Sequence, residues 1–66
     1  MKVFLIGDRV LYIPNHANGK RTHKDCAPGR VVAYGRNDDQ VMVQYADGGP
    51  AKMTYVWHLQ LLEAPK

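Results

Sequence analysis

The sequence predicts an all-β fold of five short strands. Short apolar runs alternate with turn signals along the chain, and no window shows helical periodicity over ten or more residues. One long loop early in the chain and two tight hairpins later indicate a small barrel, because closing the sheet protects the edges of so few strands. A chain of 66 residues has room for one hydrophobic core. We therefore expect residues 1–66 to form a single barrel domain.

The first strand is expected at residues 8–13, and both of its faces are apolar. Val10 and Tyr12 lie on one face, and Leu11 and Ile13 lie on the other. The second strand is expected at residues 30–34, where the turn pair Pro28-Gly29 precedes the apolar run. These two strands flank the longest connection in the chain.

The third strand is expected at residues 40–45, after a polar hairpin connection at residues 36–39. Val41, Val43 and Tyr45 alternate there with more polar residues, so one face of this strand is expected to be wet. The remaining elements are a hairpin turn at 47–50, a fourth strand at 51–56, a single 3₁₀ turn at 57–59, a fifth strand at 60–62 and a tail at 63–66.

The net charge of +3 originates in one segment. Residues 14–30 hold four basic residues against Asp25 alone, and the charges at the other positions cancel. The four basic residues are Lys20, Arg21, Lys24 and Arg30. Such a segment permits an anionic partner, for example nucleic acid.

The sequence lacks the signatures of membrane proteins and of common enzyme classes. Its longest apolar stretch, residues 3–6, is far shorter than the roughly 20 residues that span a bilayer. There is no signal-peptide h-region, and the single cysteine excludes an internal disulfide. No P-loop, dinucleotide fingerprint or serine elbow is present. We therefore expect a cytoplasmic protein that is not an enzyme and has no membrane partner.

The loop at residues 14–29 has two readings. His16, His23 and Cys26 follow the spacing H-x6-H-x2-C, and a zinc ion held by them would take a fourth ligand from Asp25, His58 or water. In the other reading, hydrogen bonds from the two histidines pin the loop and Cys26 is a small buried apolar residue. Because structural zinc sites usually show two paired ligand motifs, the incomplete pattern favours the second reading and no cofactor.

Aromatic residues suggest a binding surface. The chain has more of them than so small a core can enclose: Tyr12, Tyr34, Tyr45, Tyr55 and Trp57. Tyr55-Val56-Trp57 puts two large rings on one face of a strand, and we expect Trp57 to be exposed. On small β-barrels, aromatics beside basic loops stack nucleic-acid bases or enclose methylated side chains. The candidate partner-binding residues are Lys20, Arg21, Lys24, Arg30, Tyr34 and Trp57.

The overall pattern resembles the SH3-like barrels, including KOW and Tudor domains. Three segments carry the resemblance, which covers residues 7–62: Gly7-Asp8-Arg9-Val10, Gly29-Arg30-Val31-Val32 and Val41-x-Val43-x-Tyr45-x-Asp47-Gly48. These segments are common in barrels of unrelated function, so the resemblance implies the fold and not the role.

The long loop resembles that of short uncharacterised proteins encoded by phages, prophages and their bacterial hosts. The matching residues are Val10-x-Tyr12-Ile13-Pro14-x-His16-Ala17-x-Gly19 and His23-x-Asp25-Cys26-x-x-Gly29-x-Val31. The sequence departs from this group at Lys24, where a proline is usual, and at Ala27, where an acid is usual. The resemblance implies a small phage accessory protein acting in a bacterial cell.

The C-terminal strands also resemble the plasmid-borne type II dihydrofolate reductases, which are SH3-like tetramers around a shared pore. The residues concerned are Gly7-Asp8-Arg9-Val10, Gly29-x-Val31-Val32 and Thr54-Tyr55-Val56-Trp57-x-Leu59-x-x-Leu62-Glu63. Where that family has V-Q-I-Y, this chain has Thr54-Tyr55-Val56-Trp57, so a phenol replaces the amide expected to bind cofactor and substrate. This resemblance implies self-association more than reductase chemistry.

We therefore expect a small binding module that contacts nucleic acid, or a host protein that handles nucleic acid, through its basic loop and neighbouring aromatics. An oligomeric oxidoreductase similar to the type II reductases is the alternative from another class. A structural module with a zinc-pinned loop is the third.

Overall fold

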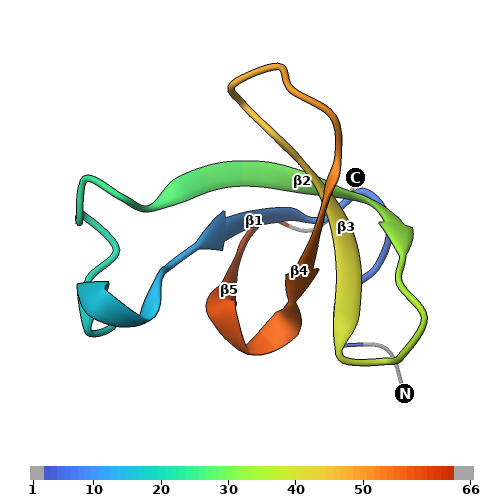
Figure 1. The fold of residues 1–66 in the computed structure, drawn as a ribbon, viewed down its shortest axis with the longest axis horizontal. Coiled ribbons are helices and arrows are strands. Elements are labelled where there is room, and N and C mark those ends of the chain that lie inside the picture. The colour runs from blue at the N-terminus through green and yellow to red at the C-terminus, as the bar shows by residue number, and fades with distance from the viewer. Residues whose placement is uncertain (1–2, 64–66) are drawn as a thin grey trace.

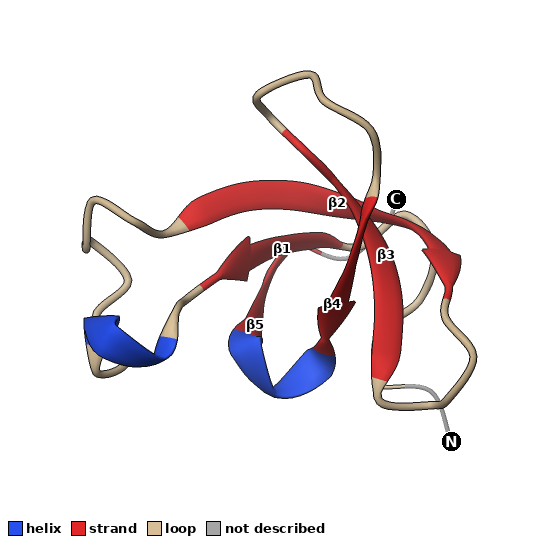
Figure 2. Ribbon diagram, in the orientation of Figure 1, coloured by secondary structure: helices blue, strands red, loops and turns tan. Residues whose placement is uncertain are grey.

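The computed structural model describes residues 3–63, which form five antiparallel strands in one sheet of order β4-β3-β2-β1-β5 (Figures 1 and 2). The elements are β1 (Arg9–Tyr12), η1 (Asn15–Ala17), β2 (Ala27–Tyr34), β3 (Gln40–Tyr45), β4 (Lys52–Tyr55), η2 (Val56–His58) and β5 (Leu59–Glu63). The prediction of an all-β chain is confirmed, and the strand order is consistent with a small SH3-like fold. No helix within residues 3–63 is long and apolar enough to cross a membrane.

The sheet is strongly bent and open. Figure 1 shows β1 and β2 side by side, with β3 and β4 running across them. No strand ladder joins the two edge strands, β4 and β5, within the described part of the chain, so the expected barrel is not closed by hydrogen bonds. The single turn of η2 connects them, and its Val56 N–H donates to the Asp39 carbonyl at 2.9 Å.

The core lies inside the bend and is built mainly from valines. Val10, Val31, Val41 and Val43 are each almost fully buried. They come from three neighbouring strands, and Val31 pairs directly with Val43. Burying one valine side chain stabilises the fold by about 1.5–3 kcal/mol. The predicted alternation of β3 is confirmed at its core face, where Val41 and Val43 point inward.

Phe4 adds an N-terminal segment to this core. It is buried against the valines, although the expected core began only at residue 7. The buried Asp8 fixes the segment, because its Oδ2 accepts the Leu5 N–H at 2.9 Å. The Gly7 N–H donates to the Val31 carbonyl at 2.8 Å and joins the segment to β2.

β2 begins three residues earlier than expected, so Pro28 and Gly29 lie inside the strand and do not form a turn. They pair with Leu11 and Val10 of β1. Gly29 is required by close packing: a Cβ there would lie 2.6 Å from the Val43 Cγ1. A local reading of Pro-Gly as a turn was therefore wrong, because a contact distant in sequence selects the glycine.

The other elements lie within one or two residues of their expected places. β3 has the predicted bounds, β1 and β4 are shorter by two residues, and the 3₁₀ turn starts one residue early. β5 runs from Leu59 to Glu63 and is longer than expected. Most of the expected tail, residues 64–66, lies outside the described residues.

Candidate functional site

The loop between β1 and β2 is a succession of tight turns. Backbone hydrogen bonds link positions three apart: Ala17 to Pro14, Lys20 to Ala17, His23 to Lys20 and Cys26 to His23. Asn18 and Gly19 adopt positive φ angles of 53° and 78° to turn the chain after η1. Because Pro14 and Ala17 are buried, the start of the loop is attached to the body of the protein.

Two histidines of this loop, His16 and His23, meet at Asp25. The His16 Nε2 lies 2.6 Å from the Asp25 Oδ2, and the Asp25 N–H donates to the His23 Nδ1 at 3.0 Å. The two imidazole rings lie edge to face with centroids 5.2 Å apart. These are the hydrogen bonds that the second reading of the loop expected.

Cys26 does not belong to this group. Its thiol is half-buried and donates to the Lys20 carbonyl at 3.2 Å, which closes the next turn of the loop. His58, the other residue considered as a ligand, packs its ring against Tyr12 with centroids 5.8 Å apart. Neither residue is among the clustered ligand atoms of the described chain, which come from His16, His23 and Asp25.

The basic residues of the loop project into solvent. Lys20, Arg21 and Lys24 are exposed, and no ion pair within residues 3–63 engages them. The backbone between them is held, because the Lys20 carbonyl accepts hydrogen bonds from both the His23 N–H and the Cys26 thiol. Three positive charges therefore stand on an ordered turn.

A groove of about 250 Å³ separates this loop from η2. The loop lines it with Ile13, Pro14, Asn15 and Gly19, and the other wall is formed by Trp57, His58, Leu59 and Gln60. The Ile13 N–H donates to the His58 carbonyl at 2.8 Å, and this bond fixes the start of the loop beside η2. Trp57 thus stands next to the segment that continues into Lys20.

Trp57 is the most exposed ring of the groove. Its side chain is 63% exposed, as expected from the sequence, and it stacks on Tyr55 with centroids 4.5 Å apart and planes 9° apart. The two rings lie together, but not on the face of one strand as predicted, because β4 ends at Tyr55 and Trp57 lies in η2. Tyr55 covers one face of the indole, so the exposed area lies on the opposite face and the edges.

Arg30 and Tyr34 are not part of this surface. The Arg30 guanidinium donates to the Gly7 carbonyl at 2.8 Å, and the residue pairs with Arg9 and Gln44 in the middle of the sheet. Tyr34 ends β2 and packs against the hydrophobic core. The loop joins β2 at Ala27, and Tyr34 lies at the other end of this strand, roughly 23 Å away along an extended chain that rises about 3.3 Å per residue. Of the six predicted residues, only Trp57 lines the groove; Lys20 follows Gly19 of the opposite wall in the chain, and Arg21 and Lys24 lie further along the same loop.

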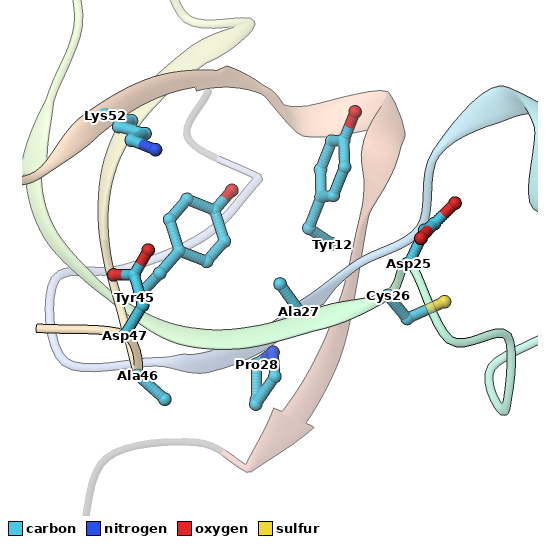
Figure 3. A pocket seen from close by; sticks show the side chains of 9 residues that line it. All are labelled: Tyr12, Asp25, Cys26, Ala27, Pro28, Tyr45, Ala46, Asp47 and Lys52. Atoms are coloured by element: carbon cyan, nitrogen blue, oxygen red, sulfur yellow. The ribbon is translucent and has the colours of Figure 1, made fainter. Parts of the chain in front are cut away.

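A second pocket, of about 400 Å³, has Asp25 among its lining residues (Figure 3). Figure 3 shows Asp25 and Cys26 at one end and Tyr45 and Lys52 at the other. Tyr12 and Tyr45 meet edge to face within it, with centroids 6.3 Å apart. The sequence analysis did not predict this pocket, because it forms where the ends of β1 and β3 meet the start of β4.

The phenol of Tyr45 lines this pocket and has a raised pKa. Burial raises the pKa of its phenol above the ordinary value of 10.0. A hydrogen bond with the Thr54 hydroxyl, 2.8 Å long, partly offsets this by lowering the pKa, and the nearby Tyr12 raises it. The phenol is therefore a neutral hydrogen-bonding group at physiological pH.

Comparisons with protein-family models, with curated protein sequences and with solved structures found no match to this chain. The resemblances to phage-encoded proteins and to type II reductases therefore stay predictions from the sequence. The groove beside Trp57 and the cluster at Asp25 are the two features on which a function can be argued.

Proposed function

We propose that this protein binds single-stranded nucleic acid in the groove between its long loop and η2. The observation that carries the proposal is the exposed indole of Trp57, stacked on Tyr55 beside a loop with three exposed basic side chains. The resemblance to uncharacterised phage accessory proteins implies no chemistry of its own, and it suggests the cytoplasm of a bacterial host as the setting for this role.

The aromatic pair is suited to stacking with an unpaired base. Stacking on an aromatic side chain is worth about 1–3 kcal/mol per base and does not depend on base identity. Because Tyr55 lies parallel to Trp57, the indole is held in one orientation before a ligand arrives. In a duplex, bases already stack on their neighbours, so this surface favours single strands.

The loop supplies the contact to the phosphates. Lys20, Arg21 and Lys24 lie within five consecutive residues and are exposed. Three phosphate contacts on a single strand predict a slope of log affinity against log salt of about −2. Because stacking and phosphate contacts do not depend on the identity of the base, we expect weak sequence preference.

The fluorescence of Trp57 provides the test, since it is the only tryptophan in the chain. Single-stranded DNA and RNA oligonucleotides, and a duplex control, are titrated at two salt concentrations. We expect quenching by single strands that weakens with salt. Absence of quenching and of a change in anisotropy of labelled oligonucleotides at low salt would overturn the proposal and favour a protein partner.

Matched variants distinguish binding by the loop charges from unspecific attraction by the net positive charge. The double variant Lys20→Ala/Arg21→Ala should weaken binding about tenfold or more and flatten the salt slope. The control, Arg36→Ala/Lys52→Ala, removes the same charge from exposed positions outside the groove and should have a small effect. Equal losses in both would show unspecific attraction instead of a built surface.

A further inference from the structure

We propose that His16, His23 and Asp25 form a binding site for a divalent transition-metal ion such as Zn²⁺, with water completing the coordination. One ligand atom from each of the three residues lies within 4.8 Å of the other two. The proposal rests on this cluster alone and not on nucleic-acid binding.

The distances bracket those of a coordinated ion. Tetrahedral ligands at Zn–N and Zn–O bonds of about 2.0–2.1 Å are about 3.3 Å apart. The His16 Nε2 lies 2.6 Å from the Asp25 Oδ2, and the His23 Nδ1 lies 4.0 Å from the same oxygen. Small side-chain rotations, each moving an atom by roughly 1 Å, bring the three to the required separation.

The hydrogen bonds of the cluster allow an ion to take the place of a proton. The close approach of the His16 Nε2 to the Asp25 Oδ2 places one proton between them. An ion bound at Nε2 takes the place of that proton, which moves to the Nδ1 of a neutral imidazole or, from an imidazolium, is released to solvent. The His23 Nδ1 already carries its lone pair toward Asp25, since it accepts the Asp25 N–H at 3.0 Å. An ion therefore substitutes for hydrogen bonds that already orient the ligands.

The donor set defines the class of metal. Two imidazole nitrogens and one carboxylate oxygen suit zinc and its neighbours in the first transition series, whereas Mg²⁺ and Ca²⁺ prefer all-oxygen sites. All three residues are at least partly exposed, so ions and water have access. This ligand set differs from the sequence hypothesis, because Asp25 takes the place of Cys26, whose thiol is bonded to the Lys20 carbonyl.

The charges of the loop determine how tightly the site is expected to bind a metal ion. Asp25 contributes one negative charge, and Lys20, Arg21 and Lys24 of the same loop oppose a dication. Because these lysines and the arginine are exposed, their opposition is screened by salt. We expect a site weaker than the thiolate-rich sites of zinc fingers and one that salt strengthens.

Direct titration tests the site. The whole protein is treated with a chelator, transferred to chelator-free buffer and titrated with Zn²⁺ by calorimetry, and native mass spectrometry gives the stoichiometry. We expect one ion per chain and a heat of binding that varies with the buffer, because the buffer takes up protons displaced from the ligands. Failure to bind Zn²⁺ at any stoichiometry would overturn the proposal, whatever the result with oligonucleotides.

Variants identify the ligands. His16→Ala and Asp25→Asn should each weaken binding by at least about tenfold, whereas Cys26→Ala and His58→Ala should leave it unchanged. With Co²⁺ as the probe, the protein should lack the charge-transfer absorption of a thiolate ligand. Loss of binding in Cys26→Ala, or full binding in Asp25→Asn, would contradict the assignment. Circular dichroism and thermal unfolding check that each variant is folded. If His16→Ala does not fold, His23→Gln serves as the second ligand variant.

Discussion

β3 and the loop between β1 and β2 are held in place by different interactions. β3 is paired on both sides, and its inward residues Val41 and Val43 are almost fully buried. The loop buries only Pro14 and Ala17 and relies on turn hydrogen bonds and the exposed contacts of Asp25. The strand therefore carries stability, while the loop presents polar groups whose replacement costs the fold little. Candidate chemistry gathers in the loop for this reason.

The largest expected effect comes from emptying the core beneath β3. Val43→Ala removes a fully buried side chain and should destabilise the protein by about 2–4 kcal/mol, because the strands cannot close the resulting cavity. Asp25→Ala, in the loop, should cost at most about 1 kcal/mol, since its partners are exposed. Urea unfolding of both variants checks the comparison. Similar losses would show that the loop is as much a part of the cooperative unit as the strand.

A smaller effect is expected where a glycine allows two strands to approach. In Gly29→Ala, the new Cβ would lie 2.6 Å from the Val43 Cγ1 and 2.9 Å from the Gln44 carbonyl oxygen. Overpacking of this kind should cost about 1–3 kcal/mol. Gly49→Ala is the matched control, because the nearest atom there is 3.4 Å away. A decrease in the thermal midpoint for Gly29→Ala alone is expected, and equal midpoints for the two variants would refute the packing argument.

The sequence predicted best what is determined locally. The bounds of β3 follow from an alternation that is complete within residues 40–45. The stacking of Tyr55 and Trp57 does not follow from their spacing, because β4 ends at Tyr55 and Trp57 lies in η2. The start of β2 was missed because Gly29 is selected by Val43, which is distant in sequence. Phe4 was missed because its burial depends on the hydrogen bonds of Asp8 and Gly7 and not on a pattern of its own.

The candidate site was predictable in its composition and less so in its geometry. Spacing drew attention to His16, His23 and Cys26, and Asp25 was one of several possible fourth ligands. Which of the two neighbours, Asp25 or Cys26, meets the histidines depends on the turn closed by the Cys26 N–H and the His23 carbonyl. The grouping of Trp57 with the loop likewise depends on one tertiary hydrogen bond, from the Ile13 N–H to the His58 carbonyl.

The smallest expected effect concerns the pH dependence of Tyr45, where the end of β3 meets the pocket beside the loop. Burial raises the pKa of its phenol in the folded state, so the folded protein holds this proton more tightly than the unfolded chain does. The associated stability is fully present below the ordinary value of 10.0 and is lost as pH rises through the folded pKa. Thr54→Val removes the hydrogen bond that lowers this pKa and should raise it further, whereas Tyr12→Phe removes the neighbouring hydroxyl whose electrostatic interaction raises it and should lower it. NMR titration of the Tyr45 ring carbon in the two variants measures both directions. Shifts of the same sign in both would mean that the end of β3 rearranges on substitution. The contrast between a strand held by its buried core and a loop held by exposed hydrogen bonds would then not extend to the pocket that they share.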